Sequence, residues 1–242
     1  MNISGRNPVM EALKSERTID CLYIKSGDKE GSIKKILSMA KEQRIIIKEV
    51  DRNKLDELSE GTQHQGVVAI VTDYKYFDLE EVLESLKEKN EKPFFIILDE
   101  IEDPHNLGAI IRSAEGAGAN GVIIPKRRSA SVNATVEKTS AGATSYIPVI
   151  KVTNLVATIE RLKKENIWIY ALDMNGEIYD TVDLKGSIGL VVGNEGKGIS
   201  RLIKEKCDFT VKIPMNGKVG SLNASVAASI LLYEVVRQRR NS

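Results

Sequence analysis

The first third of the chain alternates between stretches with helical and with strand-like spacing of apolar residues. Apolar positions three or four apart predict helices, and short runs of β-branched residues predict strands. Asn7 and Pro8 fit the N-cap and first turn of one helix, and Asp51 can cap another. Helices and strands are predicted in turn at residues 7–13, 21–24, 33–40, 45–50, 51–58 and 66–71. This order predicts a small α/β domain over residues 1–73.

A charge-rich stretch follows, and it separates two regions of different pattern. Within it, apolar residues at helical spacing predict an amphipathic helix over residues 78–89, before Pro93. We interpret residues 74–92 as a linker or hinge between the small domain and a larger domain over residues 93–242.

The larger domain carries longer and more apolar strands. Near-continuous runs of Val, Ile and Leu alternate with helical segments, which is typical of a parallel sheet covered by helices on both faces. Strands are predicted at 94–98, 122–124, 147–150, 167–172, 188–192 and 209–213, with helices that include 107–117 and 224–236. The predicted fold class is therefore α/β.

Composition narrows the function classes. The formal net charge is +1 and 42% of residues are hydrophobic, so a nucleic-acid surface would have to be local. Cys21 and Cys207 lie too far apart for a metal-type pair, and no cluster has metal-ligand spacing. No signal peptide or long apolar segment is present, which favours a cytoplasmic protein without a bound metal or a membrane partner.

Two glycine-rich runs require opposite interpretations. Residues 116–121 match the G-x-G-x-x-G dinucleotide pattern, but they follow a predicted helix and open a strand. We therefore interpret them as a helix C-cap and turn. Residues 193–198 follow a predicted strand and precede a helix, where parallel sheets bind ligands, although a plain tight turn is the alternative.

A third segment, residues 213–223, is rich in polar residues and glycine and enters an apolar helix. Ser221 or Asn223 could simply cap that helix. The same residues could instead form a pocket wall between a buried strand and a buried helix.

Three ordered motifs closely resemble the SpoU (TrmH-type) branch of the SPOUT RNA methyltransferases. They are Asp103-Pro104-His105-Asn106 through Arg112-Ser113-Ala114, Val192 through Gly198, and Ile213-Pro214-Met215 through Ser221-Leu222-Asn223. Ser4 through Val9 and Thr62 through Val67 resemble the L30e-like substrate-binding domain of bacterial 23S ribosomal RNA guanosine 2'-O-methyltransferases. The resemblance covers nearly the whole chain.

This resemblance implies an L30e-like domain followed by a methyltransferase domain knotted as a trefoil, a feature that sequence physics alone would not predict. It also implies a homodimer with the donor site beside the interface. The methyl donor would be S-adenosyl-L-methionine, held by Gly193, Ile213 and Leu222 with help from Leu172, Ala141, Asn194 and Gly198. Without the family, Ile213 and Leu222 would be read as simple core residues.

Arg112 is the catalytic residue that the resemblance implies, with Asn106, Glu195, Ser221 and Asn223 beside it. An arginine stays protonated far above neutral pH. We therefore expect Arg112 to anchor a phosphate and stabilise a developing alkoxide, while a substrate phosphate or water helps to remove the proton. An ordinary surface ion pair is the alternative for Arg112.

RNA contacts are expected from Arg6, from Lys126, Arg127 and Arg128, and from Lys197 and Arg201, although each is also typical of a solvated face. The expected function is rRNA processing by 2'-O-methylation of a guanosine in 23S rRNA, either free or in a large-subunit assembly intermediate. A transfer RNA guanosine is the alternative substrate. A catalytically silent ribosome-assembly protein and a dehydrogenase are the alternative classes, and binding of S-adenosylmethionine or NAD would separate them.

Overall fold

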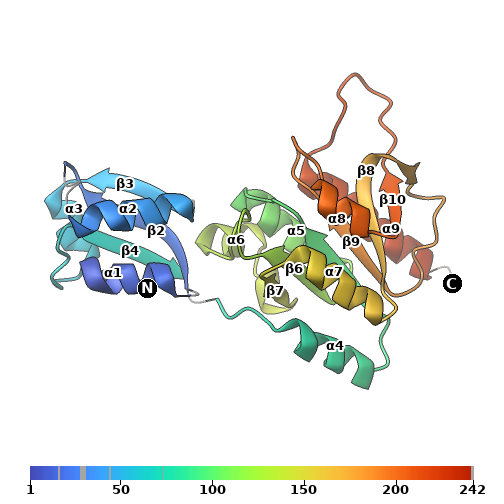
Figure 1. Cartoon of the computed structure of the whole chain (residues 1–242), viewed down its shortest axis with the longest axis horizontal. Coiled ribbons are helices and arrows are strands. Elements are labelled where there is room, and N and C mark those ends of the chain that lie inside the picture. Colours follow the sequence, from blue (N-terminus) through green and yellow to red (C-terminus); the bar gives the residue numbers. More distant parts are fainter. Residues whose placement is uncertain (16, 28–30, 44, 73, 241–242) are drawn as a thin grey trace. The chain divides into compact units, whose positions relative to one another are not determined.

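The computed structural model describes residues 1–15, 17–27, 31–43, 45–72 and 74–240. The chain divides into two compact units, Met1–Lys75 with Val132–Ala134, and Tyr76–Ser131 with Thr135–Ser242. The domain boundary expected at residue 73 lies outside the described residues. Each unit is a β-sheet with helices packed against it (Figure 1).

The first unit is built on a mixed four-stranded sheet. Its elements are β1 (Asn2–Ser4), α1 (Arg6–Lys14), β2 (Thr18–Lys25), α2 (Ser32–Glu42), β3 (Ile46–Val50), α3 (Arg52–Leu58) and β4 (Val67–Thr72). The strand order is β1-β4-β2-β3, with β2 and β3 parallel and β4 antiparallel to both of its neighbours. The apolar sides of α1 and α2 form the core with this sheet, so the unit buries its own hydrophobic surface.

Local details of this unit differ from the sequence prediction at its start. The pattern does not predict β1, because three residues are too few to show an alternation. The predicted N-cap at Asn7 is wrong: α1 begins at Arg6, and Gly5 is its N-cap with a φ of 97°. Pro8 therefore lies inside the first turn, where its missing N–H would have no partner. The predicted Asp51 cap is confirmed, since its carboxylate accepts the Lys54 N–H at 2.8 Å.

The second unit is built on a six-stranded parallel sheet. Its elements are α4 (Leu79–Glu88), β5 (Phe94–Leu98), α5 (Pro104–Gly116), β6 (Gly121–Pro125), α6 (Ala134–Thr139), β7 (Val149–Val152), α7 (Leu155–Lys164), β8 (Trp168–Ile178), β9 (Ile188–Val192), α8 (Arg201–Lys206), β10 (Phe209–Lys212) and α9 (Ala224–Arg240). A short 3-10 helix, Ala143–Ser145, precedes β7. The strand order is β10-β8-β9-β5-β6-β7, and every pair is parallel. This confirms the predicted fold class.

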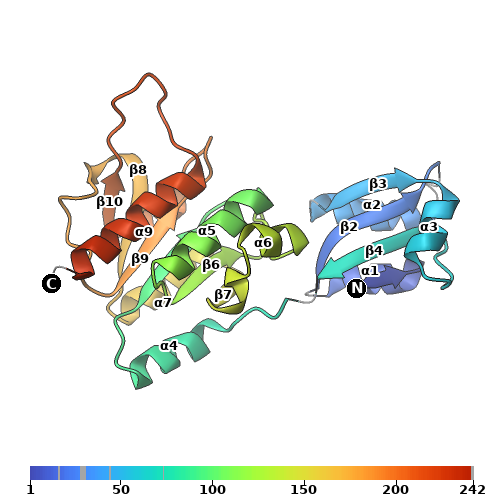
Figure 2. The ribbon, with the colours of Figure 1, turned by 180° about the vertical axis from the view of Figure 1, so that it is seen from behind.

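Helices cover the two faces of this sheet. Apolar residues of α4, α7 and α8 join one core cluster with the sheet, on the side seen in Figure 1. Figure 2 shows α5 and α9 side by side on the opposite face. Two contacts show that α5 and α9 run in the same direction: the Ser113 and Ser229 hydroxyls lie 2.8 Å apart, and Gly116 lies next to the Tyr233 hydroxyl. Their N-termini therefore meet at one end of the sheet.

The helix in the segment that we interpret as a hinge, α4, is packed against the second unit. Asp78 caps α4 by accepting the N–H groups of Glu80 and Glu81. The apolar side chains Leu79, Val82, Leu83 and Leu86 belong to the core cluster of the second unit. A connector free in solvent would not bury four large side chains, so α4 contributes to the stability of this unit.

β8 is longer and less regular than predicted. Its pairing with β10 jumps from Ala171 opposite Thr210 to Glu177 opposite Val211. The residues between, Leu172 to Gly176, therefore leave the ladder as an irregular segment, which we call the β8 bulge. Gly176 closes it, because a Cβ there would lie 2.5 Å from the backbone of Thr210.

We predict that Leu83→Ala lowers the free energy of unfolding of the full chain by about 2–4 kcal/mol, since it leaves a cavity at a side chain that is 2% exposed. Denaturant unfolding followed by circular dichroism measures this change. Glu84→Ala, on the exposed side of the same helix, is the matched control and is expected to change stability by less than about 0.5 kcal/mol. Equal effects of the two substitutions would show that α4 is not packed.

Candidate active site

A cavity of about 500 Å³ opens beside the β8 bulge and the carboxyl ends of β9 and β10, the edge where parallel sheets hold ligands. Three segments form its walls: the β8 bulge, residues 193–198 and residues 213–222, with the start of α9 beneath them. Its volume lies within the range of small-molecule sites. Nine of the site residues predicted from sequence line it, namely Leu172, Gly193, Asn194, Glu195, Lys197, Gly198, Ile213, Ser221 and Leu222.

The β8 bulge adds lining residues that the sequence pattern does not predict, among them Asp173, Met174 and Asn175. Asp173 accepts a hydrogen bond from the Lys204 ammonium at 2.8 Å and from the Asn175 N–H at 3.1 Å. Burial acts to raise the pKa of Asp173, but these hydrogen bonds outweigh it and the pKa is lowered. The Asn175-Gly176 pair was the available signal, because this dipeptide often marks a turn or bulge.

Residues 193–198, which we call the donor loop, are held by their own side chains. The Asn194 amide donates to the Glu100 carbonyl at 3.2 Å and accepts the N–H groups of Gly196 and Lys197 at 2.9 and 3.2 Å. A Cβ on Gly193 would lie 2.3 Å from the backbone of Gly198, so only glycine lets the loop close on itself. The side chain of Asn194 therefore shapes the loop.

Glu195 joins two distant helices at the mouth of the cavity. Its Oε1 accepts hydrogen bonds from the Asn106 amide at 3.0 Å, from the Asn223 amide, and from the Ala224 N–H at 3.1 Å. Asn223 also donates to Asn106 at 2.9 Å. The structure thus brings together three of the five predicted catalytic residues, and a fourth, Ser221, lies in the cavity wall.

Asn223 has a second role at the start of α9. Its side-chain oxygen accepts the N–H groups of Ser225 and Val226, at 2.9 and 3.3 Å, which is an N-cap. The capping interpretation and the pocket-wall interpretation of this segment therefore both describe real contacts. Ser221, in contrast, makes no such cap contact within the described residues.

Arg112 lies apart from this cluster. It is exposed on α5, it does not line the cavity, and no hydrogen-bond or ion-pair partner is found for it within residues 74–240 or the described part of the first unit. The N-cap of α5 is Asp103, so Asn106 lies in the first turn and Arg112 in the third. The sequence pattern predicts a helix that begins at residue 107, which would put Arg112 in its second turn, but the helix begins at Pro104.

Ala141 does not line the cavity. It lies in the exposed turn after α6 with a φ of 51°, where its N–H donates to the Lys138 carbonyl at 3.2 Å. Ala141 is therefore not among the residues that line this cavity, and its expected contact with the donor stays a prediction.

The candidate RNA-binding residues are distributed over both units. In the first unit, the Arg6 guanidinium donates to the Gln65 carbonyl at 3.0 Å. In the second, Lys126, Arg127 and Arg128 are exposed in the loop after β6, and Arg201 pairs with Glu205 on the surface of α8. Lys197 projects from the donor loop with a side chain that is 78% exposed. Of the candidate RNA-binding residues, Lys197 is therefore the one that lines the cavity.

Two family models match the chain. The model of the SpoU rRNA methylase family covers residues 93–233, and the model described as RNA 2'-O ribose methyltransferase substrate binding covers residues 3–77. The chain belongs to the SpoU (TrmH) family. It is an RNA 2'-O-ribose methyltransferase that depends on S-adenosylmethionine.

Relatives of this family match over most of their length. YacO of Bacillus subtilis (strain 168), named as a TrmH family tRNA/rRNA methyltransferase, is 49% identical over 98% of this chain and 95% of its own. The SpoU methyltransferase AviRb of Streptomyces viridochromogenes, solved in complex with AdoMet, is 26% identical with a TM-score of 0.64, over 100% of this chain and 91% of its own. A TrmH/SpoU tRNA modifying enzyme of A. aeolicus is 32% identical with a TM-score of 0.57, over 67% of this chain and 85% of its own.

No helix in the described part of the chain could cross a membrane.

Gly193→Ala is expected to weaken S-adenosylmethionine binding roughly tenfold or more, because the new Cβ forces the donor loop apart at a cost of about 1–3 kcal/mol. Isothermal titration of the purified enzyme with the donor measures it. Gly196→Ala is the matched control in the same loop, since its Cβ would meet nothing closer than 3.6 Å. Equal affinities of the two variants would contradict a donor site bounded by this loop.

Substitutions at Asn223 separate its two contacts. Asn223→Ala removes the cap and the bonds to Glu195 and Asn106, and it should lower the free energy of unfolding by about 1–2 kcal/mol. Asn223→Ser keeps a capping oxygen, so we expect stability within about 0.5 kcal/mol of the wild type, but it is too short to donate to Glu195. If methyl transfer falls in both variants, the hydrogen bonds from Asn223 to Glu195 and Asn106 matter for activity. A loss of activity confined to the alanine variant would mean that only the cap matters.

Proposed function

We propose that this enzyme methylates the 2'-hydroxyl of a guanosine ribose in 23S ribosomal RNA, in the cytoplasm, on free RNA or on a large-subunit assembly intermediate. The observation that carries the proposal is the donor cavity whose rim holds the Asn106, Glu195 and Asn223 cluster. The first unit, which matches a substrate-binding model, favours a large folded RNA as substrate. A transfer RNA guanosine is the alternative, because the A. aeolicus relative is a tRNA modifying enzyme.

The residues at the cavity fit an adenosyl donor. Backbone groups of Gly193 and the apolar side chains of Ile213 and Leu222 would hold it, with Leu172 and Gly198 completing the walls. When bound, S-adenosylmethionine supplies an electrophilic methyl group. The enzyme then has to align a ribose hydroxyl with that methyl group and to assist the loss of one proton.

Arg112 would act on the substrate as a cation. A guanidinium that stays protonated is a poor base, but it binds a phosphate through paired N–H groups and stabilises a developing alkoxide. A substrate phosphate or water would take the proton. Ser221 and Asn223 would position the ribose at the same mouth of the cavity.

We further propose a homodimer in which the partner subunit's Arg112 completes each site. Arg112 is exposed and lies outside its own chain's cavity. On the neighbouring helix α9, Val226 and Tyr233 are also exposed, at 47% and 53%. Exposed apolar residues beside a cation that has no partner among the described residues are typical of a surface that another protein covers. A second copy that covers this face would bring an arginine to each cavity.

The direct test uses total RNA from a strain that lacks the protein, incubated with the purified enzyme and labelled S-adenosylmethionine. The proposal expects label on a 2'-O-methylated guanosine in 23S rRNA, located by mapping the labelled nucleotide. Label confined to tRNA would select the alternative substrate. Label in no RNA fraction, neither free nor in ribosomal particles, would contradict the proposed activity.

Arg112→Ala is expected to slow single-turnover methyl transfer by about 100-fold or more, as is common when one preorganised donor to a developing anion is lost. Affinity for the methyl donor should not change, because Arg112 lies outside the cavity. Arg112→Lys is the conservative control and should rescue only part of the rate, since an ammonium lacks the planar pair of donors. An undiminished rate for Arg112→Ala would eliminate this role.

Mixing the Arg112→Ala and Gly193→Ala proteins tests the shared site. A heterodimer then carries one site with an intact cavity and an intact arginine from the other subunit. Partial recovery of activity is expected, and no recovery under conditions of subunit exchange would place Arg112 in its own subunit's site.

A further inference from the structure

Two residues with left-handed backbone conformations face each other at the carboxyl edge of the second sheet. Glu100, after β5, has a φ of 55°, and Arg128, after β6, has a φ of 56°. Residues with long side chains rarely adopt this conformation, and it persists only where the surroundings hold it. Such residues cluster at functional sites, so the contacts that hold these two indicate their role.

Glu100 connects two loops through three contacts. Its Oε1 accepts a hydrogen bond from Arg128 at 3.1 Å, and its Oε2 lies 3.6 Å from the Lys197 ammonium. Its backbone carbonyl accepts from the Asn194 amide at 3.2 Å. Asn194 and Lys197 belong to the donor loop, so one residue ties the wall of the donor cavity to the basic loop after β6.

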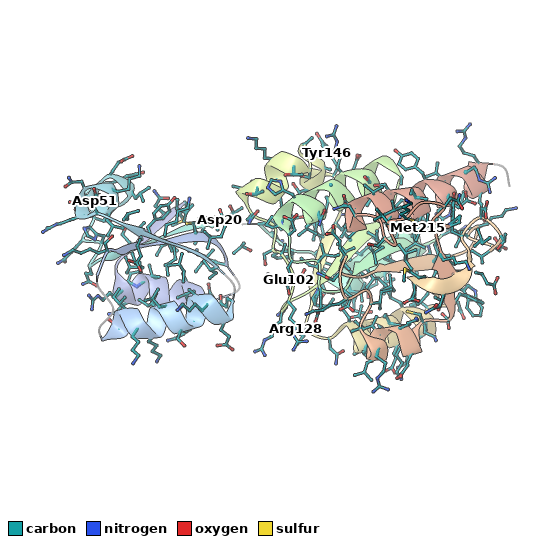
Figure 3. The ribbon with its side chains drawn as sticks, turned by 90° about the horizontal axis from the view of Figure 1, so that it is seen from above. Asp20, Asp51, Glu102, Arg128, Tyr146 and Met215 are labelled. Atoms are coloured by element: carbon teal, nitrogen blue, oxygen red, sulfur yellow. The ribbon has the colours of Figure 1, made fainter. Side chains whose placement is uncertain are left out.

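Burial differs sharply within this cluster. The side chain of Glu100 is only 17% exposed, whereas those of Arg128 and Lys197 are 72% and 78% exposed. Arg128, labelled in Figure 3, lies at the margin of the second unit. A nearly buried carboxylate thus holds two cations whose outer sides remain open to an anion from another molecule.

We propose that Glu100 is a specificity-determining residue for RNA, which joins Arg128 and Lys197 into one phosphate-binding pair and weakens the binding of RNA that cannot engage both. The proposal rests on the proposed function, in which these cations contact RNA. Carboxylate and phosphate oxygens compete for the same N–H groups. A phosphate placed between the two cations gains both contacts, while a phosphate elsewhere meets cations already neutralised by Glu100.

The charge of Glu100 lowers the affinity of the enzyme for non-specific RNA. The affinity of a protein for arbitrary RNA depends on how many uncompensated cations replace the counterions of the nucleic acid. Glu100 removes about one such charge from the rim of the donor cavity. Glu100 thereby lowers the affinity for all RNA. It can still raise specificity, because specificity is the difference between the affinities for the substrate RNA and for other RNA.

The test measures binding of the full-length enzyme to a labelled RNA duplex of arbitrary sequence over a series of salt concentrations. Glu100→Gln keeps the shape and the backbone contact but removes the charge. We expect about two- to fivefold tighter binding at low salt and a plot of log K against log salt that is steeper by about 1. Glu160→Gln is the matched control: it removes the same charge from an ion pair with Lys206 at 2.6 Å, between α7 and α8, and should leave the slope unchanged.

A second variant and a double substitution make the result specific. Glycine adopts the left-handed backbone conformation freely, so Glu100→Gly should retain the fold. It should bind RNA as Glu100→Gln does. In a Lys197→Ala, Arg128→Ala background, Glu100→Gln should have no effect on the slope. A merely structural role of Glu100 would not tighten RNA binding in any of these proteins.

Binding by Glu100→Gln that equals Glu160→Gln, or that is weaker than the wild type, would overturn the proposal. That result is distinct from a failure of the proposed function, in which the wild-type enzyme itself neither binds RNA nor transfers a methyl group to it. The two measurements use the same wild-type protein, so each can fail separately.

Discussion

The carboxylate of Glu195 is the contact on which the geometry of the site depends. It accepts hydrogen bonds from the side chains of Asn106 and Asn223 and from the first N–H of α9, and it is itself carried on the donor loop. One acidic group therefore ties the loop after β9 to the N-termini of both helices on that face. Partial positive charge at a helix N-terminus stabilises an anion at this position. The cavity wall is fixed because these three elements cannot move independently.

The parallel sheet supplies the rigid base for this arrangement. β9 and β5 are buried on both faces, and they carry the donor loop and the segment with Asp99 and Glu100 at their carboxyl ends. The buried Asp99 carboxylate accepts the Ser200 N–H at 2.7 Å and so fixes where the donor loop ends. In α/β enzymes the binding and catalytic residues commonly lie on loops at the carboxyl ends of rigid strands. Recognition of the substrate can then be assigned largely to a separate unit with its own core.

Much of the fold follows from local physics that the sequence displays. Uninterrupted apolar strands such as Phe94–Leu98 and Ile188–Val192 predict a doubly covered parallel sheet, and both strands have the predicted bounds. Context also decides correctly against a dinucleotide site at residues 116–121, where α5 ends and β6 begins. The trefoil knot stays a prediction that rests on the resemblance.

Other features depend on contacts between distant residues, which no local pattern contains. The bulge in β8 exists because β10 pairs on both sides of it. The Asn175-Gly176 pair indicates a turn or bulge there, but the pairing with β10 cannot be read from the local pattern. Asn106 and Glu195 are 89 positions apart, and only the fold brings them together. The same limit applies to Ala141 and Arg112: the sequence gives their order in the chain, but packing decides whether they line the cavity, and their expected roles stay predictions.

Hydrogen–deuterium exchange of the full-length enzyme, with and without S-adenosylmethionine, tests the central claim most directly. We propose that the β8 bulge, the donor loop and residues 213–222 form one site for the methyl donor. Exchange is then expected to slow in all three segments on addition of the donor, with little change in the first unit. Protection that is absent from these segments, or that appears at another edge of the sheet, would contradict it.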